Sequence, residues 1–455
     1  MNLIEKILTA IEEQNIQNFT LKECKTETEE LFFVKKELTL SRNKNVSKCD
    51  VTIYHDFEKD GTKMRGSSSF VADLTMSIGE LTKKIAAAYT SAHSVCNPYY
   101  KLPASNEMFV EQDTIHTVSA DTAFDMNYSS NSNADNQNVD TDSANDSGKQ
   151  LYSANDIADI LYKNDNNPNA FINSLEIFVT AKKVTIINSN GVNISYNEQT
   201  YDGEFVVQCK EPNDVELYQN FQFSSLDKSI DTALADLLSQ NLQMVHDRAN
   251  AISLHDAPDM ALSYKSVILE GSSVYELFLY YLKRLDASMI YPGYSQFKIG
   301  EPVISNSNAD KLTITLTPKQ PYSSEGVKLI HTNLIKDNIA NRITGNARFS
   351  FYLGIPAIGE YESFQMDCGS NTLSELCKEP YLKIVNFSDF QMNELTGQFG
   401  GEFRLAYYFD GTKTIPVTGG SITGNINDIV KTIRFSKESQ SFYNFNGPKA
   451  VSYKA

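Results

Sequence analysis

The hydrophobic and polar positions near the end of the chain predict a β-hairpin followed by a helix. From Phe403 to Phe409 every second residue is apolar or aromatic, which is the period of a strand with one buried face. Asp410-Gly411 then supplies a pair typical of a tight turn, and Pro416 suits a strand edge or end. Asn425, with Asp428 three positions on, resembles a helix cap. The helix that follows is expected to bury Ile426, Ile429, Val430 and Ile433.

Four other segments carry apolar residues at spacings of three and four positions, which predicts amphipathic helices. The first is 1–14, and the second runs from the capping-box pattern Ser77-Ile78-Gly79-Glu80 to about residue 94. The remaining two cover about 226–251 and 273–285.

Runs rich in β-branched and aromatic residues predict strands elsewhere. In the first half of the chain these runs are 31–40, 51–57, 176–180, 184–187, 192–196 and 204–209. Turns are expected at Lys59-Asp60-Gly61-Thr62 and at Asn190-Gly191, so the later runs form an antiparallel meander. In the second half strands are expected at 267–269, 312–316 and 347–352.

These elements predict an α+β fold with large mixed or antiparallel sheets flanked by helices, because helices and strands do not alternate strictly and several strands are joined by hairpins. The length of 455 residues exceeds a single comfortable core. We therefore expect an N-terminal α+β domain at 1–225 and a sheet-rich C-terminal domain at 226–455.

The charge balance argues against a nucleic-acid ligand. The net charge is -17 and no cluster of Lys and Arg makes a basic groove, so a phosphate backbone would be repelled. The first 14 residues lack the apolar region of a secretion signal, and the longest apolar run, 277–282, is too short to cross a bilayer. We expect a cytoplasmic protein without a membrane span.

The six cysteines are expected to be reduced and structural, since none forms a CxxC pair. They are Cys24, Cys49, Cys96, Cys209, Cys368 and Cys377.

The composition changes to Asn, Asp and Ser over about 119–150, which predicts a surface insertion that cannot bury enough apolar area to order itself. A calcium loop around Asp140 and Asp142 is disfavoured, because Ala144 fills the next ligand position and the required Gly and Glu do not follow.

The common catalytic motifs HExxH, GxSxG and GxxxxGK[ST] are all absent from the sequence. His93 and Cys96 are three apart on one helix, but two ligands cannot close a tetrahedral zinc site, so packing is the favoured role. In three places His precedes Asp, and adjacent side chains point apart on a strand or helix. These pairs are His55-Asp56, His246-Asp247 and His255-Asp256.

Aromatic residues on the helix 273–285 are expected to belong to the core rather than to a cofactor site, because their spacing is that of a buried helix face. They are Tyr275, Phe278, Tyr280 and Tyr281.

The segment 397–429 follows the order GxFxxEFRLxYYFDGxxxxPVxGxSIxGNIxDI, which resembles the C-terminal signature of the TldD/TldE (PmbA) family. The segments 55–68, 267–270, 295–301 and 369–376 are also similar to parts of that family. The resemblance spans almost the whole chain apart from the insertion. Family members are described as peptidases that mature or degrade peptides and, in older naming, as candidate modulators of DNA gyrase.

In the metal-binding TldD branch, zinc is held by two His of a helical HExxxH motif and by a Cys close to the C-terminus. The corresponding helix here, 273–285, contains no His and retains only Glu276, and the last cysteine is Cys377. The chain therefore resembles the TldE branch, whose members lack the ligands and pair with the TldD subunit to form the proteolytic complex. The resemblance implies no catalytic residue, cofactor or metal ligand in this chain, with zinc only in a TldD-like partner.

Three functions remain open at this stage, and with them the question of whether the chain is an enzyme. They are a non-catalytic subunit of a metallopeptidase, a stand-alone peptide-binding or structural homodimer, and an active peptidase with an unrecognised site. In the first case an extended peptide could add as a strand to the sheets of the second domain. Candidates for a peptide-facing wall are Gly400, Gly401, Gly424 and Asn425, although glycines at strand ends more often shape turns.

Overall fold

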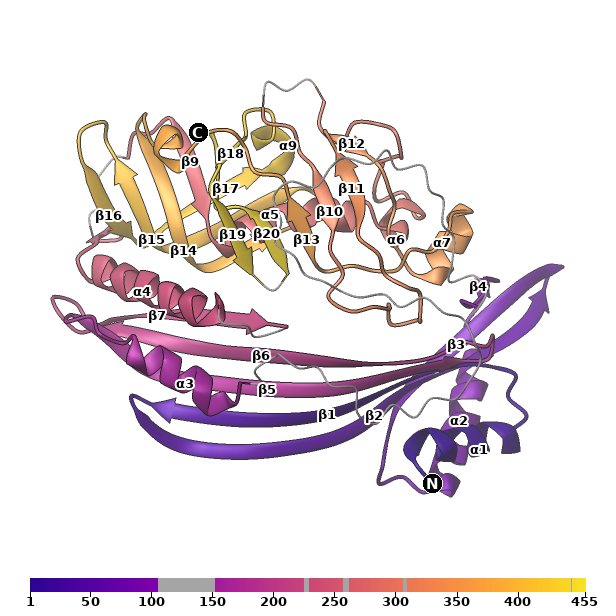
Figure 1. Ribbon diagram of the computed structural model, residues 1–455. Coiled ribbons are helices and arrows are strands. Elements are labelled where there is room, and N and C mark those ends of the chain that lie inside the picture. Colours follow the sequence, from indigo (N-terminus) through magenta and orange to yellow (C-terminus); the bar gives the residue numbers. More distant parts are fainter. Residues whose placement is uncertain (105–151, 225–228, 257–261, 306–308, 443) are drawn as a thin grey trace.

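The structure is a computed structural model, which describes residues 1–104, 152–224, 229–256, 262–305, 309–442 and 444–455 (Figure 1). The predicted insertion at 119–150, with Asp140 and Asp142, lies outside the described residues. Within the described ranges, no helix combines the length and apolar character that a membrane crossing requires.

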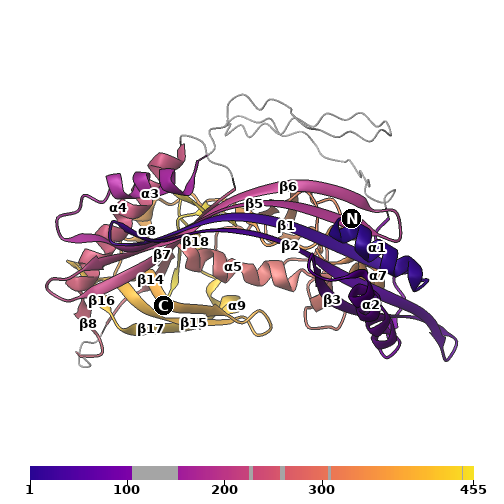
Figure 2. The same cartoon turned by 90° about the horizontal axis from the view of Figure 1, so that it is seen from below.

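The first sheet dominates the N-terminal half. In the described residues its seven strands lie in the order β4-β3-β2-β1-β5-β6-β7, and every neighbouring pair is antiparallel. Four of these strands are 17 to 23 residues long, and they curve along the whole length of the molecule (Figure 2). The bounds are β1 Asn18–Val34, β2 Glu37–Lys59, β3 Thr62–Asp73, β4 Asn97–Pro98, β5 Ala170–Asn188, β6 Asn193–Cys209 and β7 Val215–Phe223.

Two pairs of helices cover opposite ends of this sheet. Near one end lie α1 (Leu3–Glu13) and α2 (Ile78–Ala92), which share a core with Leu21 and Val51. Near the other end lie α3 (Ala154–Lys163) and α4 (Ser229–Ala249), which bury their apolar side chains with those of β5, β6 and β7 (Figure 1). Neither pair of helices therefore packs against the middle of the long strands.

The C-terminal half places the helix α5 (Ser272–Arg284) in one core with residues of two further sheets. One sheet has the order β18-β21-β9-β14-β15-β16-β8, with β17 also paired to β15, and the other has the order β12-β11-β10-β13-β20-β19. Both are mixed, because β9 with β14, β8 with β16 and β13 with β20 run parallel.

The strands of the two C-terminal sheets and the short helices between them have the following bounds. The first sheet contains β8 Ile252–Ser253, β9 Ser266–Glu270, β14 Tyr381–Met392, β15 Gln398–Phe409, β16 Thr414–Thr418, β17 Gly420–Asn425, β18 Arg434–Phe435 and β21 Ala450–Lys454. The second contains β10 Ile314–Leu316, β11 Thr332–Lys336, β12 Ile339–Ala340, β13 Phe364–Met366, β19 Ser439–Phe442 and β20 Phe445–Pro448. The short helices are α6 Ala287–Ile290, α7 Ala347–Leu353, α8 Leu373–Leu376 and α9 Ile426–Ile429.

The α+β prediction is confirmed, as are the long helices and the terminal hairpin. β15 and β16 flank the turn at Asp410-Gly411, and Ser77 forms the predicted capping box with Glu80. The four apolar residues expected to be buried after Asn425 are all buried. The helix there is only four residues long, and Asn425 caps the amide of Asn427 rather than that of Asp428.

Several strand predictions were wrong in their limits or type. The run 31–40 is not one strand, because Lys35 adopts a left-handed conformation with φ 55° and turns β1 into β2. The runs 176–180 and 184–187 are parts of the single strand β5, and the runs 192–196 and 204–209 are parts of the single strand β6. The segment 347–352 is the helix α7, which Asn346 caps and Gly354 ends at φ 68°.

The helix α4 bears on the predicted division at 225/226. We assigned it to the second domain, yet its buried residues share a core with β5, β6 and β7 of the first sheet. The division into domains stays a prediction.

Candidate functional site

The helix α5, which the resemblance aligns with the HExxxH helix of the TldD branch, follows the buried strand β9 directly and packs inside the C-terminal core. If Glu276 is the glutamate of that motif, the two histidine positions are 275 and 280. Both are tyrosines in this chain. The predicted core role of the aromatic residues on α5 is confirmed, since Phe278, Tyr280 and Tyr281 are at most 3% exposed.

The two tyrosines are engaged in packing and hydrogen bonding. The Tyr275 hydroxyl donates to the Glu362 carbonyl at 2.8 Å, and its ring stacks on Phe364 with the centroids 5.3 Å apart. Burial, with smaller contributions from the charges of Glu276 and Glu362, raises the pKa of Tyr275 to about 12. The Tyr280 ring contacts Tyr281 edge to face at 5.2 Å. Neither side chain is a neutral imidazole that could donate a lone pair to zinc at neutral pH.

Glu276 is a half-buried carboxylate. Burial is the larger cause that raises its pKa, and the negative charge of Glu394, in the turn between β14 and β15, adds to it. The same turn is held to α5 by Arg284, whose Nη1 donates to the Leu395 carbonyl at 3.3 Å. Glu276 is therefore in an environment that favours its protonated form.

The donor set for a zinc ion is not assembled in the part of the chain that the structure describes. There, no group of three or more His, Cys, Asp or Glu side chains lies close enough together to hold a metal ion. Cys377 follows α8 and packs against Ile268 and Tyr381, and burial raises the pKa of its thiol. The residues present do not fit a catalytic zinc site of the three-ligand type.

The candidate His93 is engaged in contacts between rings. His93 stacks on His55 with ring centroids 3.5 Å apart, and the Tyr89 hydroxyl lies 3.0 Å from Nδ1 of His55. Cys96 is exposed and lies near Lys59 instead. These contacts agree with the predicted packing role of His93.

Two of the three His-Asp pairs differ in whether their side chains approach each other. Asp56 turns away from its neighbouring His and holds Arg65 through two oxygens at 2.6 and 2.8 Å, as expected for adjacent residues on a strand. In the second pair, Nδ1 of His246 lies 3.8 Å from Oδ1 of Asp247, so here the two side chains do approach each other.

The candidate peptide-facing residues lie at the junction of β14, β15 and β17, where the strands approach closely. A Cβ atom at Gly401 would lie 2.3 Å from the Asp389 carbonyl oxygen, and one at Gly424 would lie 2.5 Å from the Phe399 ring. A Cβ at Gly400 would lie 2.9 Å from the Ile422 carbonyl oxygen. Asn425 caps α9 and donates to the Thr396 carbonyl at 3.0 Å. Close packing thus explains these residue types, and their contact with a peptide stays a prediction.

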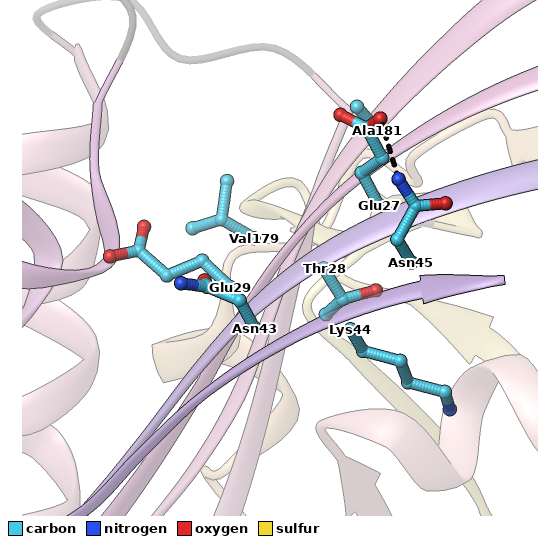
Figure 3. Close-up of a pocket in the computed structure, with 8 residues that line it drawn as sticks. All are labelled: Glu27, Thr28, Glu29, Asn43, Lys44, Asn45, Val179 and Ala181. Atoms are coloured by element: carbon cyan, nitrogen blue, oxygen red, sulfur yellow. Dashed lines mark hydrogen bonds between the residues drawn. The ribbon is translucent and has the colours of Figure 1, made fainter.

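A hollow of about 440 Å³ lies on the first sheet, far along the chain from the predicted residues (Figure 3). It is lined by Glu27, Thr28, Glu29, Asn43, Lys44, Asn45, Val179 and Ala181. The pairing register brings these side chains together from three strands, with Glu27 between Asn45 and Ala181. The polar residues of β1 can be seen in the sequence, but the sequence does not show which strands pair with β1.

The comparisons with known proteins agree with this architecture. Residues 263–453 match the family model described as the PmbA/TldA metallopeptidase C-terminal domain. The structure is similar to TldE from Thermococcus kodakarensis, with a TM-score of 0.70 at 12% identity, covering 99% of this chain and 98% of that one. It is also similar to a protein of Thermotoga maritima described as a candidate modulator of a DNA gyrase, with a TM-score of 0.69 at 11% identity, covering 99% and 98%.

A curated relative, an uncharacterized protein of Methanocaldococcus jannaschii, is 22% identical over 275 residues. The match covers 54% of this chain and 60% of the relative's length. Residues 263–453 therefore carry the PmbA/TldA metallopeptidase C-terminal domain, and the whole chain shares the fold of these two structures.

Proposed function

We propose that this chain is the non-catalytic, TldE/PmbA-like subunit of a metallopeptidase system that matures or degrades peptides. The observation that carries the proposal is the replacement of both histidine positions on α5 by tyrosine, with Glu276 retained. The donated hydrogen bond and the ring contacts of Tyr275 further support a structural role for this helix.

A catalytic zinc ion needs three protein ligands and an open position for water. Glu276 alone supplies one oxygen ligand on α5, and the nearby Glu394 raises the energy of its charged form. The chemistry of the donor set therefore favours a partner chain as the source of zinc and of peptide-bond hydrolysis.

The contribution of this chain to peptide handling is expected to come from its sheets. β17 pairs with β15 along 420–425, and its outer side is a candidate edge for an extended peptide. Under this proposal Gly400, Gly401, Gly424 and Asn425 shape the wall beside that edge. The partner is a TldD-like chain, and the physiological location is the cytoplasm.

The test is to produce the chain alone and together with an HExxxH-bearing partner from the same genome. We expect stoichiometric zinc, by elemental mass spectrometry, only in the partner or in the complex, and cleavage of casein only by those two samples. The mass of the complex is measured by size-exclusion chromatography with light scattering. Zinc bound to this chain alone, together with casein cleavage, would contradict the proposal.

A variant of this chain separates a scaffold role from a catalytic one. Glu276→Gln should leave kcat/KM of the complex within about twofold, because the glutamate of this subunit takes no part in the reaction. The matched control is the corresponding Glu→Gln change in the partner, which should reduce kcat/KM by at least about 100-fold. If the chain forms only a homodimer that binds peptide without a partner, the stand-alone function replaces the subunit proposal.

A further inference from the structure

The strand β2 has an open edge over half of its length. β1 pairs with β2 from the hairpin turn onward, whereas β3 pairs only with Lys48–Lys59. Along 37–47, no pairing on the outer side of β2 is made by any strand of the described residues. The nine consecutive residues 37–45 are all exposed. This stretch is therefore accessible from the edge and from both faces.

The backbone groups that this edge offers follow from the pairing register. The two-residue turn Asp60-Gly61 makes Lys59 and Thr62 a hydrogen-bonded pair, and such pairs alternate along an antiparallel ladder. The register of β2 with β3 has no shift, so odd-numbered residues of β2 bond towards β3. In the open stretch the N–H and C=O groups of Ser41 and Asn43 accordingly point outward. No strand of the described ranges pairs with these groups, so an added strand could do so.

One face beside the edge is acidic and hollowed. Glu27 and Glu29 lie in the hollow of about 440 Å³, next to Asn45 and Asn43, while the Lys44 side chain points away from them (Figure 3). Oε1 of Glu27 accepts from Asn45 Nδ2 at 3.1 Å, and Oε2 of Glu29 accepts from the Ala154 amide at 3.2 Å. Each of these hydrogen bonds leaves the other carboxylate oxygen available to a further donor.

The opposite face of the same edge is apolar and then basic. Leu40 is 48% exposed, and Arg42 and Lys44 follow it on this face. Leu38 lies on the other face, because the register of β1 with β2 shifts after Phe32 and pairs Leu38 with Phe33. Arg42 is held by Glu30 on β1, with Nε 2.6 Å from Oε2. A strand that pairs with β2 would therefore meet carboxylates on one face, and Leu40 followed by two basic residues on the other.

We propose that the outer edge of β2 binds an extended peptide by strand addition, with Lys or Arg side chains on the Glu27–Glu29 face and apolar side chains on the Leu40 face. An added strand would lie ~4.8 Å from β2 and ~10 Å from β1. A lysine side chain is long enough to cross the short Asn43 and Asn45 and reach the carboxylates. The inference concerns a different sheet from the peptidase-like domain and does not depend on the subunit role.

The charges beside the edge of β2 indicate which kind of strand would bind there. A second copy of β2, paired antiparallel about Ser41, would bring residues 37–41 beside Asn43 and Asn45 at the hollow, and none of these five is cationic. It would also bring the Arg42 and Lys44 side chains of the two copies to one face, where like charges repel. A peptide with alternating basic residues neutralises Glu27 and Glu29 instead.

The first experiment measures the binding of a fluorescent nine-residue peptide, in which lysine alternates with valine or threonine, to the full chain by anisotropy. Ser41→Pro removes the outward N–H without breaking the ladder to β1, so Kd should rise at least about tenfold. Ser41→Ala keeps the N–H and should stay within about twofold. Circular dichroism and thermal unfolding verify that both variants are folded.

The second experiment tests the hollow. The double change Glu27→Gln and Glu29→Gln keeps the acceptors for Asn45 and Ala154 and removes both charges, so Kd should rise about three- to tenfold and depend less on salt. Glu12→Gln, on the exposed side of α1, is the control. A peptide with glutamate in place of lysine should bind at least about tenfold more weakly.

Two results would overturn the proposal. One is a Kd that neither Ser41→Pro nor the Glu27/Glu29 double change alters. The other is a dimer of the free chain in light scattering that Ser41→Pro converts to monomer, since the edge would then be occupied by a second copy.

Discussion

At the scale of single residues, the glycines of the terminal signature mark places where strands approach too closely for a side chain. At Gly401 a Cβ would meet backbone oxygen on β14 at 2.3 Å, which cannot be relieved by turning a side chain. Gly401→Ala should therefore lower the free energy of unfolding by ~1–3 kcal/mol, measured by urea denaturation.

A second glycine provides the matched control for this change. Gly79 lies in the first turn of α2, and a Cβ there would have no atom within 4 Å. Gly79→Ala should raise the free energy of unfolding by ~0.5 kcal/mol, because alanine has the higher helix propensity. Equal effects of the two substitutions would show that the close approach at β14 is not what requires glycine.

A second residue-level prediction concerns Glu325, a partly buried carboxylate that accepts the Ala347 amide at 2.7 Å at the start of α7. Burial, and to a smaller degree the charge of Glu360, raises the pKa of Glu325 in the folded protein. Its contribution to stability is therefore fully present below the unfolded pKa and is lost as the pH rises through the folded pKa. Glu325→Gln keeps the acceptor and removes the charge.

This variant should have a higher melting temperature than the parent at pH 7, and the gain should shrink as the pH falls towards 4. Thermal unfolding across that range measures it, with the exposed Glu12→Gln as the control that shifts little at any pH. A melting temperature that falls at pH 7 would mean that the charged carboxylate makes a favourable interaction there.

At the scale of elements, α7 joins the C-terminal half to the start of the chain. The Tyr352 hydroxyl donates to the Pro98 carbonyl at 2.6 Å, and Arg348 Nη2 donates to Asn97 Oδ1 at 2.8 Å. Tyr352→Phe should cost ~1 kcal/mol and speed hydrogen exchange of the amides from Asn97 to Tyr100. Tyr294→Phe, at a ring that is 61% exposed, is the control and should change neither quantity.

The same element shows what the sequence could and could not predict. Helices with a long apolar stripe and a capping box, such as α2, were predicted almost to the residue, because local spacing determines them. In α7, Phe349 and Phe351 suggested the period of a strand, but the cap from Asn346 and the Gly354 end made a helix of seven residues. A segment so short carries too little periodicity to distinguish the two.

The candidate sites also differ in how far the sequence alone predicts them. The tyrosines at 275 and 280 could be read directly from the helix pattern. The hollow beside Glu27 could not, because Val179 and Ala181 reach it only through the register of β1 with β5, across some 150 residues of sequence. Such non-local pairing is set by the whole fold rather than by any local preference.

At the scale of the whole molecule, α4 contacts both halves. Its buried face packs on the first sheet, while Asp247 near its end accepts the Tyr407 hydroxyl of β15 at 2.6 Å. Burial and then the bond to Asp247 raise the pKa of Tyr407, so the phenol stays protonated as the donor. α4 thereby links a core of the N-terminal half to a central strand of the C-terminal half.

This link can be measured by a double-mutant cycle of Asp247→Ala and Tyr407→Phe. Because the hydrogen bond is partly buried and its acceptor is charged, the coupling energy should be ~1–2 kcal/mol. Urea denaturation of the four proteins gives the value, and the pair Gln240→Ala and Tyr407→Phe is the control, since Gln240 is an exposed residue of α4 two turns before Asp247. A coupling below ~0.3 kcal/mol would mean that α4 is held by the first sheet alone. The boundary between independently stable halves would then lie after Ala249, rather than at 225/226 where the hydrophobic pattern placed it.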